Sequence, residues 1–253
     1  MQFYVGAQPH QGWPLSLRGQ KVCISANSLR DRAGRVAFVG QSDGWLLDSG
    51  AFTQLNTHGG FVQSPEDYAA MITRYGEFEG SGLAAAVSQD FMCEPFVLER
   101  FGRTVADHQR MTIERYDQIR AAGTGRTHLM PVLQGWEPSD YLRHLDAYGE
   151  RLTPGMWVGV GSVCKRQGNP RAIAYILQQI LQHRSDLRLH GFGVKKTALK
   201  SASVRDMLHS ADSMAWSFAA RREGRDQNDW FEALQFAHQV TRKVPSDPLP
   251  LFA

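Results

Sequence analysis

Three aspartates and one glutamine stand where short apolar runs of the sequence end. Asp48 closes WLLD, Asp90 closes AVSQD and Gln134 closes MPVLQ, while Asp212 lies within SADSMAWS. Carboxylates are unfavourable beside an apolar core unless they are paired, hydrogen-bonded or used in chemistry. Two carboxylates that face each other across a sugar carbon can carry out exchange with retention: one attacks as a nucleophile, while the other protonates the leaving group and later takes a proton back. We therefore expect these four side chains to meet in one active site.

Glycines near these positions would let a flat ligand approach the backbone closely. They are Gly50, Gly135, Gly159, Gly161, Gly191 and Gly193. The runs VGVGSV and HGFGVKK look like nucleotide-binding turns, but neither completes GxGxxG, so we expect no dinucleotide site. Tight packing within a barrel would explain some of these glycines equally well.

The elements that must position these residues are short apolar, β-branched runs that alternate with segments of helical period. This alternation is typical of strand–helix units around a parallel sheet. We expect strands at residues 3–7, 22–26, 45–48, 83–90, 128–134, 156–163, 187–194 and 211–216. About eight such strands close a (β/α)8 TIM barrel, whose active site lies at the carboxyl ends of the strands.

Helices are expected to coat this sheet. A buried helical face is indicated by Ile173, Ile176, Leu177, Ile180 and Leu181. Prolines that suit a first helical turn are Pro65, Pro138 and Pro170. We predict one α/β domain over residues 1–243 and an extended, proline-rich tail over residues 244–253.

The composition suits one ordinary enzyme domain of 253 residues, with 42% hydrophobic and 21% charged residues. The net charge of +3 is compatible with a nucleic-acid partner without demonstrating one. The cysteines, Cys23, Cys93 and Cys164, are far apart in the sequence, so we expect no disulfide. We see neither a membrane span nor a signal peptide and expect a cytoplasmic protein.

Together these motifs resemble those of tRNA-guanine transglycosylases and, more closely, those of their relatives in the deazapurine DNA-modification (DpdA) family. The resemblance extends from about Phe3 to Arg222 and rests on LLDSGAF, SQDF, PVLQG, VGVGSV, LHGFGV and ADSMAWS, which occur in the family's order. Each motif is short, but six in order at compatible spacing are hard to obtain by chance.

The resemblance implies a pentosyltransferase that replaces guanine in DNA with a 7-deazaguanine such as preQ0 or preQ1, without a cofactor. Asp212 would be the nucleophile that attacks C1′ of the sugar, and Asp48 the acid and base that handles the purine. A purine inside a duplex would first have to flip out of the base stack.

The resemblance also implies a set of groups that bind the purine. Its edge would be recognised by the side chains of Asp90 and Gln134 and by the backbone at Gly135, Gly161 and Ser162. Phe52 would stack on one face of the base, and His190 is the candidate for the other face. His190 stands where the tRNA enzymes carry a methionine, and a core or rim histidine explains this position equally well.

The largest departure from the tRNA enzymes lies near the end of the chain. Those enzymes carry a CxCxxC cluster and a later histidine that bind structural zinc, whereas ARREGRDQNDWFEALQFAHQV contains no cysteine. We therefore expect no metal and no zinc subdomain. This absence and the DSMAWS run favour DNA over a tRNA anticodon loop as substrate.

Basic residues follow the later predicted strands, where the phosphates of a bound nucleic acid would pass. They are Lys165, Arg166, Lys195, Lys196, Arg221, Arg222 and Arg225. An ordinary solvated surface would account for any one of them alone.

Three alternatives stay open at this point. The same exchange on tRNA would keep the chemistry and change the substrate. A barrel hydrolase would use Asp48, Asp90 and Asp212 to bind Mg²⁺ and act on a nucleotide or phosphate substrate. A catalytically inert nucleic-acid-binding relative is disfavoured by the intact pair of Asp48 and Asp212.

Overall fold

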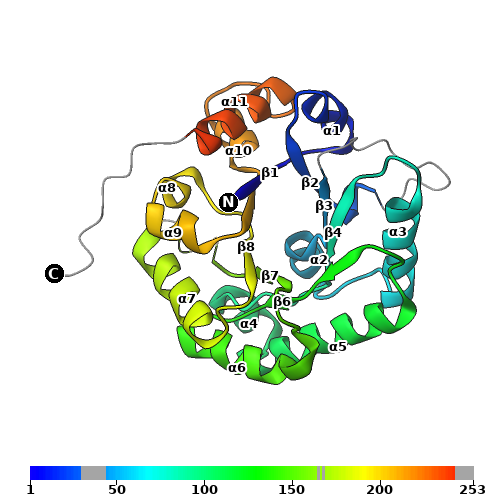
Figure 1. Cartoon of the computed structure of the whole chain (residues 1–253), viewed down its shortest axis with the longest axis vertical. Coiled ribbons are helices and arrows are strands. Elements are labelled where there is room, and N and C mark those ends of the chain that lie inside the picture. The colour runs from blue at the N-terminus through cyan, green and yellow to red at the C-terminus, as the bar shows by residue number, and fades with distance from the viewer. Residues whose placement is uncertain (30–43, 164–165, 167–168, 243–253) are drawn as a thin grey trace.

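A ring of parallel strands forms the centre of the computed structural model, which describes residues 1–29, 44–163, 166 and 169–242 (Figure 1). The strands are β1 Gln2–Gly6, β2 Lys21–Ser25, β3 Trp45–Asp48, β4 Leu83–Val87, β5 His128–Met130, β6 Val132–Leu133, β7 Trp157–Val160, β8 Arg188–Gly191 and β9 Ser210–Ser213. Their order is β5-β4-β3-β2-β1-β9-β8-β7-β6. Because β5 and β6 belong to one run of sequence, the ring is nearly closed, which confirms the predicted TIM-barrel fold.

The predicted strand over residues 128–134 is interrupted at Pro131, which has no backbone N–H to donate to a ladder. The carbonyl of Met130 accepts a hydrogen bond from Ser88 N at 3.0 Å, next to β4. The carbonyl of Pro131 accepts from Gly159 N, on β7, at 2.8 Å. The run therefore changes partner strand at the proline and joins the two edges of the sheet.

Helices surround this ring (Figure 1). They are α1 Pro9–Ser16, α2 Ala51–His58, α3 Pro65–Glu77, α4 Pro95–Phe101, α5 Val105–Ala122, α6 Pro138–Tyr148, α7 Pro170–His183, α8 Lys196–Leu199, α9 Ala202–Met207, α10 Ala215–Arg222 and α11 Trp230–Thr241, with 3₁₀ turns at Ala26–Ser28 and Gly149–Arg151. Prolines 65, 138 and 170 begin helices as predicted. Within the described residues no helix is long and apolar enough to cross a membrane.

The outward faces of the strands and the surrounding helices share one large core. A second, smaller core fills the inside of the ring. Successive strand residues face opposite sides of a sheet, so Val5 and Ile24 join the large core while Tyr4 and Cys23 face inward. The inner core consists of Tyr4, Cys23, Leu46, Ala85, Val87, Met130, Val132 and Trp157. These side chains pack the interior of the ring.

Each predicted strand corresponds to an observed one, except that residues 128–134 form two strands, β5 and β6, and every strand but β3 ends earlier than predicted. The last strand was predicted to run from Ala211 to Trp216, and this is wrong beyond Ser213. The helix α10 begins at Ala215, so the buried Trp216 side chain belongs to a helix. Alternation of apolar residues did not separate the short strand from the helix that follows. The tail predicted over residues 244–253 lies outside the described residues.

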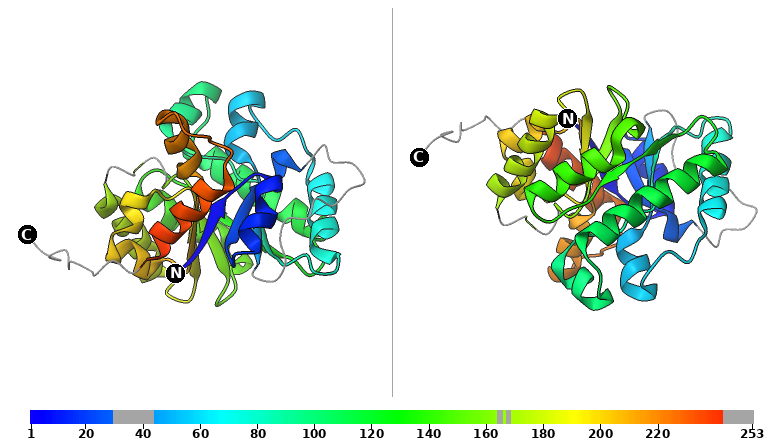
Figure 2. Two further views of the ribbon diagram at one scale, coloured as in Figure 1. Left: turned by 90° about the horizontal axis from the view of Figure 1, so that it is seen from above. Right: turned by 90° about the horizontal axis from the view of Figure 1, so that it is seen from below.

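Three helices mark the carboxyl end of the barrel. Figure 2 shows α2, α4 and α10 projecting beyond the strands at the end opposite the N-terminus. Each follows a strand that leads to one of the predicted aspartates: β3 to Asp48, β4 to Asp90 and β9 to Asp212. The loops and helices at this end therefore frame the candidate site.

Candidate active site

Asp212 faces into the ring from β9, in register with the inward-facing Tyr4 of β1. Its side chain is 15% exposed. Oδ1 accepts a hydrogen bond from the backbone N–H of Gly193 at 3.0 Å and lies 3.3 Å from Nε2 of His190. Among the described residues both of these contacts fall on Oδ1. The carboxylate is thus held through one of its two oxygens.

His190 is completely buried beneath this carboxylate. Its Nδ1 lies 2.9 Å from Oγ of Ser210, which also accepts a hydrogen bond from the indole N–H of Trp157 at 2.8 Å. If Nε2 carried no hydrogen, its lone pair would face Oδ1 of Asp212, and the two would repel each other. The favoured tautomer therefore accepts the Ser210 proton at Nδ1 and donates from Nε2 to Asp212.

Asp48 ends β3 and turns into a tight loop. Its Oδ2 accepts a hydrogen bond from the N–H of Gly50 at 3.0 Å. Gly50 has φ +75°, and its carbonyl accepts from Nδ2 of Asn27 at 3.0 Å. A Cβ at this position would lie 2.2 Å from Nδ2 of Asn27, so the turn after Asp48 requires glycine.

The electrostatic surroundings of Asp48 favour its protonated form. Burial raises its pKa to about 7, assisted by the negative charges of Asp212 and Asp90 and opposed by hydrogen bonds from the backbone of Gly50 and Ser49. A carboxyl group with a pKa near neutrality is well matched to donating and accepting protons at physiological pH. Asp212 and Asp90 are therefore close enough to Asp48 to affect its ionisation.

Asp90 and Gln134 form one hydrogen-bonded unit. Nε2 of Gln134 donates to Oδ2 of Asp90, and Oδ1 of Asp90 accepts from the hydroxyl of Ser49 at 3.1 Å. The Gln134 carbonyl oxygen Oε1 accepts from the hydroxyl of Ser162 at 2.8 Å. Burial raises the pKa of Asp90 to about 6, although its bonds from Gln134 and Ser49 oppose the shift. These buried polar groups can present donors and acceptors to the edge of a planar base.

Ser162 adopts a strained backbone conformation, with φ 57°. Its hydroxyl lies 3.0 Å from Oε2 of Glu94 and accepts from the N–H of Cys93 at 3.1 Å. These contacts join the loop after β7 to the loop after β4. Glu94 is buried, and the sequence interpretation did not include it, because nothing in the motif SQDFMCEPF distinguishes it from a loop carboxylate.

The backbone glycines of this site serve close packing. A Cβ at Gly161 would lie 2.2 Å from Nε2 of Gln134, so Gly161 makes room for the Gln134 amide. A Cβ at Gly135 would lie 2.7 Å from Cβ of Asp140, at the start of α6. Whether either backbone also contacts a ligand stays a prediction.

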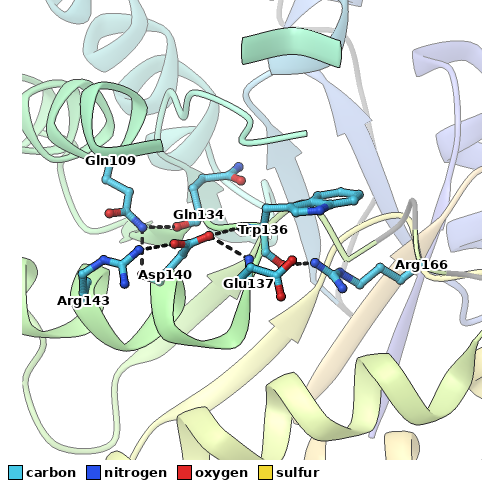
Figure 3. A network of polar contacts seen from close by, with 7 residues as sticks. All are labelled: Gln109, Gln134, Trp136, Glu137, Asp140, Arg143 and Arg166. Atoms are coloured by element: carbon cyan, nitrogen blue, oxygen red, sulfur yellow. Dashed lines mark hydrogen bonds and ion pairs between the residues drawn. The ribbon is translucent and has the colours of Figure 1, made fainter. Parts of the chain in front are cut away.

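Figure 3 shows how the start of α6 is tied to Gln134. The amide of Gln109 donates to the carbonyl of Gln134 at 2.7 Å and to that of Asp140 at 2.8 Å. Asp140 in turn accepts from the N–H groups of Trp136 and Glu137 and forms an ion pair with Arg143. This network fixes the backbone from which the Gln134 side chain reaches Asp90.

The two aromatic rings predicted to stack on the base lie in different surroundings. Phe52 is exposed on the first turn of α2, four residues after Asp48. His190 lies below the mouth, with its ring edge-on to Phe192 at 4.6 Å between centroids. Its observed contacts thus hold Asp212, and its stacking on a base stays a prediction.

The predicted phosphate-binding residues differ in their exposure and in their contacts within the protein. Lys195, Arg221 and Arg222 are exposed near the carboxyl end of the barrel. Arg166 lies over the Trp136 ring at 4.4 Å and donates to its carbonyl, and Lys196 donates to Gln239 at 2.6 Å. Arg225 pairs with Glu223 and Glu232. Lys165 lies outside the described residues.

Cys23 lies on the inner face of β2, where burial and the charges of Asp212 and Asp48 raise its pKa well above the usual range. Cys23 and Cys93 are free thiols, and Cys164 lies outside the described residues. In the described part of the chain, no three His, Cys, Asp or Glu side chains are grouped so that they could hold a metal ion.

Several residues of the site were missed at the sequence level. Ser49, Ser210 and Trp157 lie within or beside the quoted motifs, and Ser210 precedes Asp212 by two positions. Strand alternation places residues two apart on the same face, so this signal could have located Ser210. Glu94 and Ser162 are 68 positions apart in the sequence, and no sequence pattern indicates that they meet.

Fold and site together define an α/β-barrel protein with interacting aspartates at the carboxyl end of its strands. The chain belongs to the DpdA family, described as DeoxyPurine in DNA protein A, because the family model matches residues 1–244. This membership confirms the family that the motifs predicted and supports a transglycosylase-type role in the deazapurine modification of DNA. A comparison with curated proteins gives no match.

Proposed function

We propose that this protein exchanges guanine in DNA for a 7-deazaguanine of the preQ0 or preQ1 type through a covalent aspartyl–sugar intermediate. One observation carries the proposal: Asp212 and Asp48 share the inner mouth of the barrel closely enough for the charge of Asp212 to raise the pKa of Asp48. The pair therefore combines a carboxylate suited to attack with a carboxyl group suited to donate a proton.

The first half of the reaction uses Asp212 as nucleophile. A carboxylate oxygen of Asp212 forms a bond to C1′ while the bond from C1′ to N9 of guanine breaks. Asp48 transfers its proton to the departing guanine, so the base leaves in neutral form and Asp48 becomes a carboxylate. The hydrogen bonds from Gly193 and His190 hold Oδ1 of Asp212, which directs Oδ2 toward the sugar.

The second half reverses these steps with a different base. The incoming deazapurine loses its N9 proton to Asp48, and N9 forms the new bond to C1′. The bond between C1′ and Asp212 breaks, which restores the Asp212 carboxylate and the protonated Asp48. Two displacements at C1′ give retention of configuration.

Recognition of the base falls to Asp90 and Gln134, which bind each other at the mouth. The carboxylate of Asp90 accepts from the N–H groups of a guanine-type edge, and the Gln134 amide donates to its carbonyl. Phe52, exposed on α2, stacks on the base face. The backbone at Gly135, Gly161 and Ser162 adds contacts to the same edge, while Lys195, Arg221 and Arg222 contact phosphates.

The test is guanine release from two labelled substrates, duplex DNA and tRNA, in the presence of preQ0 or preQ1. Release from DNA with incorporation of the added base is the expected result. Release from tRNA alone would move the activity to RNA. Release from neither, together with a phosphate-releasing activity that a chelator stops, would replace the proposal with the hydrolase alternative.

A further inference from the structure

Exposed phenylalanines lie on three helices at the carboxyl end of the barrel. Phe52 on α2 is 54% exposed, Phe96 on α4 is 45% exposed and Phe218 on α10 is 59% exposed. These three helices project from the same end of the barrel (Figure 2). Large apolar side chains gathered on one face of a protein mark a surface that meets a partner. Of these rings, Phe96 and Phe218 have no part in the proposed exchange chemistry or in base recognition.

The clearest of these surfaces is a stripe on α10, the helix that directly follows Asp212. The α10 stripe consists of four exposed residues at helical spacing: Met214 at the N-cap of the helix, and Phe218, Arg221 and Arg222 on it. The guanidinium carbon of Arg221 lies 5.4 Å from the centre of the Phe218 ring. Two apolar groups are thus followed by two cationic groups on one exposed face of the helix that follows the candidate nucleophile.

The opposite face of α10 is anchored to the barrel. Trp216 is buried, and its indole N–H donates to the carbonyl of Gly6 at 2.7 Å. A Cβ at Gly6 would lie 2.8 Å from Cβ of Met214, so the helix start packs tightly on the end of β1. The Ser217 hydroxyl donates to the carbonyl of Gln227 at 3.0 Å. Phe218 is therefore exposed on a supported helix.

We propose that Phe218 of the α10 stripe enters the base stack of duplex DNA beside the flipped nucleotide. This inference rests on the proposed function and names the step that prepares its substrate. Flipping a nucleotide out of a duplex costs a few kcal/mol of stacking and pairing. The Phe218 ring fills the vacated space, as apolar wedges do between base steps. Arg221 and Arg222 bind the phosphates that flank it, which matches their positive charge to the anionic backbone.

A wedge acts only on stacked bases, so this role predicts different effects on duplex DNA and on single strands. Loss of the Phe218 ring should impair exchange on duplex DNA and leave exchange on single strands almost unchanged. A residue that binds the base, holds phosphates generally or supports the fold would affect both substrates. The ratio of the two activities therefore separates a wedge from the other roles.

The experiment compares Phe218→Ala with the unmodified protein on guanine-labelled DNA, presented as a duplex and as the same strand unpaired. Phe218→Ala should lower kcat/KM on the duplex about tenfold or more and change it by less than about threefold on the single strand. The matched control is Tyr175→Ala, which removes another exposed ring from α7 in the outer helical layer and should leave both activities unchanged. Equal loss on both substrates, or no loss on either, would overturn the wedge.

A second measurement does not depend on exchange. Closed circular plasmid is relaxed by a topoisomerase in the presence of protein, and the unwinding caused by inserted side chains is counted as supercoils after protein removal. The unmodified protein and Tyr175→Ala should unwind the plasmid, and Phe218→Ala should not. If guanine exchange fails while this unwinding pattern is seen, the proposed chemistry is wrong and the wedge stands. If the unmodified protein does not unwind, or if Phe218→Ala unwinds equally, the wedge is wrong.

Discussion

Nε2 of His190 lies 3.3 Å from Oδ1 of Asp212, and the histidine is completely buried while the aspartate reaches the mouth of the barrel. A chain of contacts from Trp157 through Ser210 fixes the histidine ring. The nucleophile that we propose is thus oriented from inside the barrel, on the side away from its substrate.

Removal of this support should slow the attack on C1′. His190→Ala is expected to lower kcat about 10- to 100-fold with little change in KM, because one hydrogen bond to a charged carboxylate contributes about 1.5–3 kcal/mol. Ser210→Ala, which leaves Nε2 in place, should have a smaller effect. The measurement is single-turnover formation of the covalent intermediate, with His183→Ala on the outer helix α7 as control. An unchanged rate in His190→Ala would reject the positioning role.

Ionisation of Asp48 should destabilise the folded protein. Its folded pKa of about 7 lies above the ordinary value of 3.8, so the folded state keeps a proton that the unfolded chain releases between these values. Stability is therefore highest below pH 4 with respect to this group and falls by up to about 1.4 kcal/mol per pH unit as the pH rises to 7.

Asp48→Asn should remove this contribution and flatten the dependence of unfolding free energy on pH between 4 and 7. A residual slope from Asp90 is expected, because its pKa is also raised, to about 6. Denaturant unfolding at several pH values makes the measurement, with Asp67→Asn on the exposed side of α3 as control. A slope equal to that of the unmodified protein would show that Asp48 ionises normally.

Gly161→Ala should disturb recognition of the base. The added methyl group would lie 2.2 Å from Nε2 of Gln134 and would force the amide away from Asp90. We expect a higher KM for the incoming deazapurine and weaker exchange in a protein that still folds. Gly60→Ala is the control, because a Cβ there meets nothing within 4 Å. Unchanged steady-state kinetics with the added base would remove Gln134 from the recognition site.

The basic residues after β8 should contribute to DNA binding. Alanine at both Lys195 and Lys196 is expected to weaken binding and to lower the slope of log affinity against log salt by up to about 2. The contact of Lys196 with Gln239 would reduce its share. Alanine at both Arg120 and Arg126, which precede β5 at the opposite end of the barrel, is the control. Unchanged affinity and slope would place the phosphates elsewhere.

Much of the barrel could be predicted because strand alternation and strand ends leave a clear record in the sequence. The ends of β3 and β6 locate Asp48 and Gln134, and the family motifs separate Asp212 from other aspartates. The predicted end of the last strand failed because SADSMAWS continues its apolar pattern into α10. Local pattern thus identified the elements but not every boundary.

The remaining features depend on contacts between distant segments. Glu94 reaches Ser162 through the folding together of two loops, and Arg166 turns onto Trp136. Neither contact follows from local spacing, because both side chains are long and their partners come from other loops. The chain of contacts below Asp212 likewise needs the register that sets β7, β8 and β9 side by side.

The most direct test of the account is to trap the covalent intermediate. The protein is incubated with end-labelled duplex DNA without an incoming base, and protein-bound DNA is measured after denaturation. We predict a denaturation-resistant adduct whose cross-linked peptide contains Asp212, and no adduct from a folded Asp212→Asn variant. An adduct of equal yield in Asp212→Asn, or guanine release by the unmodified protein with attachment at another residue, would contradict the central claim.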